Sequence, residues 1–353
     1  MELDISLKTL YELAIEVSAS AILALIAGPV AIILAKRMDA IDVPGSAAHK
    51  KHAAPTPLAG GLVLLLVMPI LATIFGLWKA PHIPWILAGT AVIFIFGLLD
   101  DMYGLSAPQK FTGQIIATAI LLAGGISVKF LENFHLPFPA WLILALNTLV
   151  TLLWMVGLTN ASNLLDSMDG LVAGVATISS GFFTLISLAS GQPVLSQFSA
   201  LIFGVCISLY LYNMTPARFF LGDSGAQVLG FMLAAIGILY NPPNLPQGST
   251  WFMPILLLGI PIFDTTLVVV SRLRRHKPIF QADLAHTYHR LVRLGLTPGQ
   301  AVLSVQIAAI LLCNAAFLAM SLTPKAANVL FVCILLAGAA VIIIFERVAK
   351  IEG

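Results

Sequence analysis

The chain is 353 residues long; 59% of its residues are hydrophobic and only 10% are charged, with a mean hydropathy of +1.00. Soluble domains carry about 25% charged residues, so this composition argues against a soluble globular protein and indicates a polytopic membrane protein. The net charge of +2 is uninformative as a total, and we expect no nucleic-acid partner.

Apolar segments of roughly membrane-spanning length follow one another along the whole sequence. About 11 of them can be distinguished, near residues 14–35, 58–78, 83–99, 111–128, 138–159, 169–190, 195–213, 224–241, 251–271, 299–322 and 326–345. They predict an all-α integral membrane protein with about 11 transmembrane helices. Since no repeat or soluble stretch separates them, residues 1–353 are interpreted as a single polytopic membrane domain.

Basic residues are distributed unevenly among the connections. Most of the 18 Lys and Arg residues lie after the odd-numbered segments and in the C-terminal tail, whereas the other side holds Lys8, Lys79, Lys129 and Lys325. The positive-inside tendency therefore predicts a cytoplasmic C-terminus and an N-terminus outside. Acidic residues gather at the same cytoplasmic face: Asp39, Asp42, Asp100, Asp101, Asp166, Asp169, Asp223 and Asp283. This pattern predicts an active site in the cytoplasmic loops.

The first cytoplasmic connection, residues 49–61, combines basic residues with prolines and a Gly60-Gly61 pair. Lys50 and Lys51 are typical of a loop attracted to anionic lipid, and that is one interpretation. The prolines and glycines favour a second, in which a fixed backbone closely approaches a phosphate-bearing ligand and Lys50 supplies positive charge.

Two adjacent carboxylates, Asp100 and Asp101, end the third apolar segment, and Lys110 follows them. Like charges this close repel each other, so the pair suits a divalent cation, with one carboxylate binding metal while its neighbour accepts a proton. Helix capping is the alternative role for one of them. The aspartate-rich motif of prenyl-diphosphate enzymes does not fit, because Gly104 stands where its third aspartate belongs.

A polar island at residues 160–170 lies between two long apolar segments and contains Asn163, Asp166 and Asp169. Ionisable groups against a bilayer are costly, which indicates a functional role. The Asp-x-x-Asp-Gly pattern is shared by the CDP-alcohol phosphatidyltransferases. That assignment fails because Gly174 stands where their motif requires arginine.

The connection before the eighth segment places Asp223 between Gly222 and Gly225. Asp223 suits an N-terminal helix cap, and the flanking glycines also leave room for a metal or phosphate at a helix start. Phe220 offers a flat face for stacking a base, with a core aromatic as the alternative.

The last basic connection contains His286, His289 and Arg290, which share one helix face. No Cys or Glu completes a zinc site there, so phosphate neutralisation is the favoured interpretation. A solvated basic surface explains the preceding cluster at residues 272–277.

The order of these motifs resembles the polyprenyl-phosphate N-acetylhexosamine-1-phosphate transferases (the WecA, TagO and MraY group). The shared patterns are Asp-Asp, Asn-x-x-Asn-x-x-Asp-x-x-Asp-Gly, Phe-Leu-Gly-Asp-Ser-Gly and His-x-x-His-Arg, and the resemblance extends from Asp42 to Arg290. It implies transfer of a sugar-1-phosphate from a UDP-sugar to undecaprenyl phosphate, with Mg²⁺ or Mn²⁺ and with release of UMP. The implied location is the bacterial cytoplasmic (inner) membrane, and a homodimer stays open.

The resemblance also implies roles for individual residues at the matching positions. The metal ligands would be Asp223, Asp100 and Asp101, and the catalytic residues Asp100, Asp101 and Asp166. Substrate binding would fall to Asn163, Asp169, Phe220, Lys50, Lys110, His286, His289 and Arg290. Direct attack by the lipid phosphate and a covalent aspartyl intermediate both remain open.

Residues 55–61 and the His-x-x-His-Arg pattern resemble the N-acetylglucosamine branch more than the muramoyl-pentapeptide branch, although Tyr288 stands where a histidine is common. The expected reaction is therefore transfer of N-acetylglucosamine-1-phosphate from UDP-N-acetylglucosamine. The alternatives are another UDP-N-acetylhexosamine, UDP-MurNAc-pentapeptide or, in a different class, a cation-coupled membrane transporter.

Overall fold

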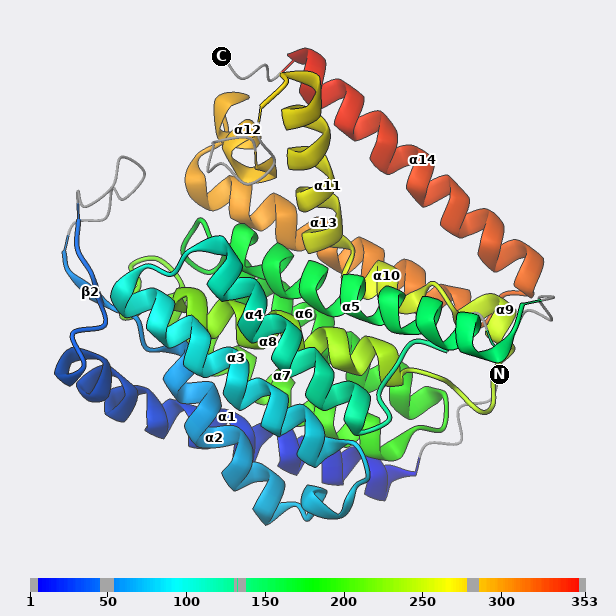
Figure 1. Cartoon of the computed structure of the whole chain (residues 1–353), viewed down its shortest axis with the longest axis horizontal. Helices are drawn as coiled ribbons and strands as arrows, with labels where there is room; N and C mark the ends of the chain where they lie inside the picture. Colours follow the sequence, from blue (N-terminus) through cyan, green and yellow to red (C-terminus); the bar gives the residue numbers. More distant parts are fainter. Residues whose placement is uncertain (1–5, 45–53, 130–131, 133–137, 278–285, 349–353) are drawn as a thin grey trace.

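The computed structural model describes residues 6–44, 54–129, 132, 138–277 and 286–348 and consists almost entirely of helices (Figure 1). The longer helices are α1 (Leu7–Arg37), α2 (Gly60–Ile74), α3 (Ile83–Tyr103), α4 (Ala107–Ala123), α5 (Ala140–Leu165), α6 (Leu171–Ala189), α7 (Pro193–Asn213), α8 (Gly222–Leu239), α11 (Gly259–Arg274), α13 (Pro298–Ala319) and α14 (Pro324–Val348). The shorter ones are η1 (Leu77–Lys79), α9 (Gln247–Thr250), α10 (Met253–Leu257) and α12 (Thr287–Arg293).

Within the described residues, eight helices are long and apolar enough to cross a membrane. A ninth span is obtained if the α9–α10 segment and α11, which are bent by 68° at their junction, are counted together. All of the predicted apolar segments overlap helices, so the all-helical, multi-pass expectation is confirmed. These candidates are fewer than the predicted segments, because α2 has only 15 residues and α4 has 17, with Lys110 and Gln114 near its start.

The bend between α10 and α11 falls at Leu258, followed by Gly259 and Pro261. A break in a helix leaves backbone carbonyls without their usual partners. Here the carbonyl of Leu257 accepts a hydrogen bond from Ser179 Oγ of α6, at 2.7 Å. The bend is therefore closed by a side chain from a neighbouring helix.

Helix α8 lies inside the bundle and packs against α2, α3 and α5 (Figure 1). In its most apolar stretch 78% of the residues are buried, compared with 11% for α14, which runs along the outer edge. Glycines let the other backbones approach the start of α8. A Cβ atom on Gly97 would lie 2.5 Å from Ser224 Cα, and one on Gly61 would lie 2.5 Å from Ser224 Oγ. Glycine is thus required where α2 and α3 meet α8.

This packing gives the Gly60-Gly61 pair a different explanation from the one the sequence suggested. A Cβ on Gly60 would lie 2.7 Å from the Cα atom of Leu221, so both glycines accommodate the segment that carries Asp223. The close backbone approach that the glycines predict is present, and its partner is α8. Lys50, which was predicted to accompany them, lies outside the described residues.

Two short strands, β1 (Ile41–Asp42) and β2 (Thr56–Pro57), pair antiparallel and close the first connection. Beyond β2, the chain joins the loop before α8: Phe220 N donates to the Pro57 carbonyl at 2.9 Å, and Phe220 O accepts from Ala59 N at 3.1 Å. These bonds fix the entry to α2 against the entry to α8.

Candidate active site

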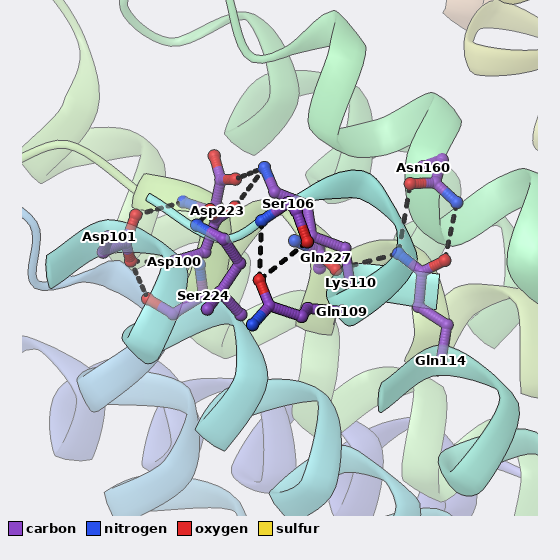
Figure 2. A network of polar contacts seen from close by, with 11 residues as sticks. Asp100, Asp101, Ser106, Gln109, Lys110, Gln114, Asn160, Asp223, Ser224 and Gln227 are labelled. Carbon is purple, nitrogen blue, oxygen red and sulfur yellow. Dashed lines mark hydrogen bonds and ion pairs between the residues drawn. The ribbon is translucent and has the colours of Figure 1, made fainter. Parts of the chain in front are cut away.

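The carboxylate of Asp101 caps the start of α8. Its Oδ1 accepts from the backbone N–H of Asp223 at 2.7 Å, and its Oδ2 accepts from the N–H and the hydroxyl of Ser224 at 3.1 and 2.7 Å (Figure 2). The first N–H groups of a helix have no partner within the helix, and a negative charge there is favourable. The aspartate pair thus reaches from the end of α3 to the first turn of α8.

The second carboxylate of the pair, Asp100, meets Asp223 through Lys110 (Figure 2). The Lys110 ammonium forms ion pairs with Asp100 Oδ2 and, at 2.9 Å, with Asp223 Oδ2. Asp100 is also fixed from its own side, because its Oδ1 accepts from Leu105 N at 2.7 Å. The side chain of Asp100 is only 5% exposed, whereas that of Asp223 is 32% exposed and can be reached from solvent. This assembly is called the Asp–Lys–Asp cluster below.

The polar island meets this cluster from the end of α5. Asp166 is the residue that ends α5, and Asn163 lies beside the Asp223 carboxylate, to which it hydrogen-bonds. Removal from bulk water, and then the negative charges of Asp223, Asp101 and Asp169, hold the pKa of the Asp166 carboxyl well above its ordinary value. Clustered carboxyl groups with a shifted pKa are typical of functional sites.

A buried row of amide side chains supports the same region. Gln114 of α4 donates from Nε2 to Asn160 Oδ1 at 3.1 Å and to Gln227 Oε1 at 3.0 Å, and Asn160 returns a bond to Gln114 Oε1 at 2.7 Å (Figure 2). These residues join α4, α5 and α8. Gln227 was not singled out in the sequence, although a glutamine one turn after Asp223 in an apolar helix was a usable signal.

The two phenylalanines before Asp223 differ in their environment. Phe219 is fully buried and stacks on Tyr212, with ring centroids 5.0 Å apart. Phe220 is half-buried and held by backbone bonds to residues 57–60. Phe219 is therefore the core aromatic, and Phe220 keeps the exposure that a base-stacking role requires.

The predicted residues His286, His289 and Arg290 belong to a second polar cluster, on α12. His286 Nδ1 lies 2.8 Å from Asp264 Oδ2, and Arg290 donates to Ser271 Oγ at 2.8 Å and to Glu346 Oε1 at 2.6 Å. Their partners come from α11 and α14, and α12 packs on α13. These contacts tie His286 and Arg290 to α11 and α14.

In this second cluster the Arg290 side chain is 1% exposed and already paired with a carboxylate. The substrate contact expected for it stays a prediction. Asp264 and Glu346, which hold His286 and Arg290, were not predicted as site residues, since each is a lone acid within an apolar helix.

The implied Mg²⁺ would need oxygen ligands from the acidic side chains of the site. Within the described ranges no three His, Cys, Asp or Glu side chains converge on one point. Mg²⁺ usually takes one or two protein carboxylates and completes its shell with water and phosphate oxygens. Asp100 and Asp223, held around one ammonium group, fit this pattern. Asp101 fits it less well, because both of its oxygens accept bonds from α8.

Comparison with known proteins identifies the family of this chain. The family model of Glycosyl transferase family 4 matches residues 83–241, a range that contains the Asp–Lys–Asp cluster and the polar island. A Bacillus subtilis (strain 168) protein named probable undecaprenyl-phosphate N-acetylglucosaminyl 1-phosphate transferase is 33% identical, over 80% of this chain and 78% of the relative. The decaprenyl-phosphate N-acetylglucosaminephosphotransferase of Mycobacterium leprae (strain TN) is 29% identical, over 84% and 81%.

A relative from the other branch is also similar. The phospho-N-acetylmuramoyl-pentapeptide-transferase of Geobacillus kaustophilus (strain HTA426) is 29% identical, over 79% of this chain and 89% of its own length. The fold and the acidic cluster therefore define a multi-pass membrane enzyme that transfers sugar-1-phosphate groups. The chain belongs to glycosyl transferase family 4, in the WecA, TagO and MraY group. Membership of an enzyme family favours the transferase over the transporter alternative.

Proposed function

We propose that this protein transfers N-acetylglucosamine-1-phosphate from UDP-N-acetylglucosamine to undecaprenyl phosphate, giving undecaprenyl-diphosphate-N-acetylglucosamine and UMP. The observation that carries the proposal is the Asp–Lys–Asp cluster beside the polar island, in a chain of this family. The sugar is supported by the two relatives whose names specify N-acetylglucosamine. Those names differ in the length of the lipid, so decaprenyl phosphate is the alternative acceptor.

In this proposal Asp223 and Asp100 hold Mg²⁺, with Mn²⁺ as an alternative, and Asp101 holds Asp223 in place by capping α8. The cation supplies positive charge that screens the two phosphate groups being joined. Lys110 adds a fixed positive charge at the same point, between Asp100 and Asp223. Phosphoryl transfer depends mainly on positioning and electrostatics, and these residues provide both.

The nucleotide would lie along Asn163, Asp169 and Phe220, and Asp166 would face the phosphates. A carboxyl with a raised pKa holds a proton more readily than an ordinary aspartate, which suits Asp166 to a catalytic role. In direct transfer, an oxygen of the lipid phosphate attacks the sugar-bearing phosphorus, and the bond to UMP breaks.

A covalent aspartyl intermediate is the second route. It predicts that the protein alone exchanges labelled UMP into UDP-N-acetylglucosamine when no lipid acceptor is present. Direct transfer predicts no exchange until the acceptor is added.

For the membrane arrangement we propose a bacterial cytoplasmic membrane, with the C-terminus and the acidic cluster on the cytoplasmic side. The excess of basic residues on that side supports this orientation. Labelling of single cysteines in intact cells would test it: a cysteine at Asp39 should be protected from an impermeant reagent, and one at Lys79 should react.

The reaction is tested by mixing the purified protein with undecaprenyl phosphate, Mg²⁺ and one UDP-sugar at a time, and measuring UMP release. UDP-N-acetylglucosamine should support the fastest turnover. A preference for UDP-MurNAc-pentapeptide or another UDP-N-acetylhexosamine would correct the sugar alone. No UMP with any of these donors, from folded protein, would refute the transferase proposal.

A further inference from the structure

The turn at Gly170 is held by two side chains from distant parts of the chain. Gly170 directly follows Asp169 and starts α6 with a φ of 75°. Its N–H donates to Asn213 Oδ1 at 2.9 Å, and its carbonyl accepts from Gln306 Nε2 at 3.1 Å. Both bonds are buried, so both polar groups flanking the glycine Cα are fixed.

Asn213 links this turn to the loop that carries the predicted base-stacking residue. It is the last residue of α7 and 2% exposed, and its Nδ2 donates to the Phe219 carbonyl at 3.2 Å. A single buried amide therefore holds Gly170 on one side and the residue before Phe220 on the other. A bond from Thr215 Oγ1 to Asp169 Oδ2, at 3.3 Å, joins the same two segments.

Gln306 reaches the turn from α13 by passing over Gly174, one turn further along α6. Its side chain is 9% exposed, and a Cβ on Gly174 would lie 2.2 Å from Gln306 Nε2. Glycine at this position therefore makes room for the glutamine. This accounts for Gly174, the residue that distinguished the polar island from the phosphatidyltransferase motif.

We propose that Asn213 and Gln306 are positioning residues for the nucleotide of the donor, and that they act through the backbone of Gly170. The inference rests on the proposed function, in which Asp169 and Phe220 bind that nucleotide. Both segments carrying these residues are loops. The Asn213 amide joins them, and the Gln306 amide holds the Gly170 carbonyl from α13. Loss of the Asn213 amide leaves the buried Gly170 N–H unpaired. Loss of the Gln306 amide leaves the Gly170 carbonyl with only the helical bond from Gly174 N, which loosens the turn that carries Asp169.

The first test is Gln306→Met, which keeps the size of the side chain and removes its donor. The KM for UDP-N-acetylglucosamine should rise by about two- to tenfold, as expected for the loss of one buried hydrogen bond. The KM for undecaprenyl phosphate should not change. Without turnover, the stabilisation of the protein by UDP against heat should decrease in the same variant.

A second variant, Gly174→Ala, should give the same result without altering either amide. Its methyl group would displace the flexible end of Gln306, so the fold is retained while the bond to Gly170 is lost. Because both variants remove one contact, their effects on the donor KM should not add when they are combined. Asn314→Ala is the matched control, since Asn314 is exposed on the same helix and bonds only Ile310 of that helix.

Unchanged donor KM and unchanged UDP stabilisation in folded Gln306→Met and Gly174→Ala would overturn the inference. Equal increases in the KM values of donor and acceptor would also overturn it, because they would show a general structural role. Inactivity of the wild-type protein with every donor refutes the proposed function instead, so the two failures are distinguishable.

Discussion

The two polar clusters of this protein differ in how their charges are satisfied. In the Asp–Lys–Asp cluster one ammonium serves two carboxylates, and Asp223 remains 32% exposed. In the α12 cluster Arg290 is buried, with Glu346 and Ser271 as its partners, and Asp264 accepts from His286 and the N–H of Thr287. The first cluster has excess negative charge that faces solvent, while the second is neutralised by its own side chains. The proposed binding of a cation and phosphates therefore concerns the first cluster.

This comparison predicts the largest effect on activity at Asp223. Asp223→Ala removes the exposed carboxylate, and turnover should fall by about a thousandfold or more. Turnover of UDP-N-acetylglucosamine at saturating Mg²⁺ measures the effect. Asp39→Asn is the control, because Asp39 is exposed outside the cluster and asparagine tolerates its positive φ. Near-normal turnover in folded Asp223→Ala would remove Asp223 from the metal role.

A smaller effect is expected at Lys110. Lys110→Met leaves Asp100 and Asp223 without their shared counter-charge, so turnover should fall by about a hundredfold. Lys110→Arg should recover part of it. Lys79→Met, which removes an exposed charge from η1, controls for the overall change in charge. If Lys110→Met and Lys79→Met behaved alike, the ammonium would have no role in the reaction.

At Asp101 we expect a mixed effect on activity and stability. Asp101→Asn replaces one acceptor oxygen with a donor that cannot cap α8, which costs about 1 kcal/mol of stability, and turnover should fall about tenfold through displacement of Asp223. Thermal unfolding and turnover are measured on the same preparation. A loss as large as that of Asp223→Ala, at unchanged stability, would instead show that Asp101 acts directly in the reaction.

The smallest effect on activity is expected in the α12 cluster. Glu346→Ala removes the carboxylate that pairs with the buried Arg290 charge, which destabilises the protein by about 3–5 kcal/mol. Turnover per folded molecule should change by about threefold or less if Arg290 keeps the partners described above, Ser271 and Glu346, during the reaction. Glu346→Gln, which keeps an acceptor, should be milder. A selective rise in the donor KM would show that Arg290 exchanges Glu346 for substrate.

The sequence predicted the components of the first cluster better than their connections. Asp100, Asp101 and Asp223 stand out as acids beside apolar segments, and the order of motifs resembled the correct family. The contacts of these acids could not be predicted, because they join residues far apart in sequence and leave no periodic pattern. The hydrogen bond from Gln306 to Gly170 is another contact of this kind. The glycines of α2 did predict close backbone contact, but the sequence could not show whether a ligand or a helix would be the partner.

The candidate spans are fewer than the predicted segments for a related reason. Hydropathy locates apolar segments, yet it does not reveal where a helix begins, and α2 starts only at Gly60 because the preceding residues pair with Phe220. The bend at Leu258 had a local signal in Gly259 and Pro261, which weaken a continuous helix. Its angle depends on packing with other helices.

The closure of that bend also has a consequence for the hydration of the broken helix. A broken helix exposes polar backbone, and polar backbone within hydrocarbon tends to draw in water. Because Ser179 satisfies the Leu257 carbonyl from inside the protein, no water molecule is needed at that carbonyl. The bend thus leaves the Leu257 carbonyl paired within the protein, although the helix is interrupted there.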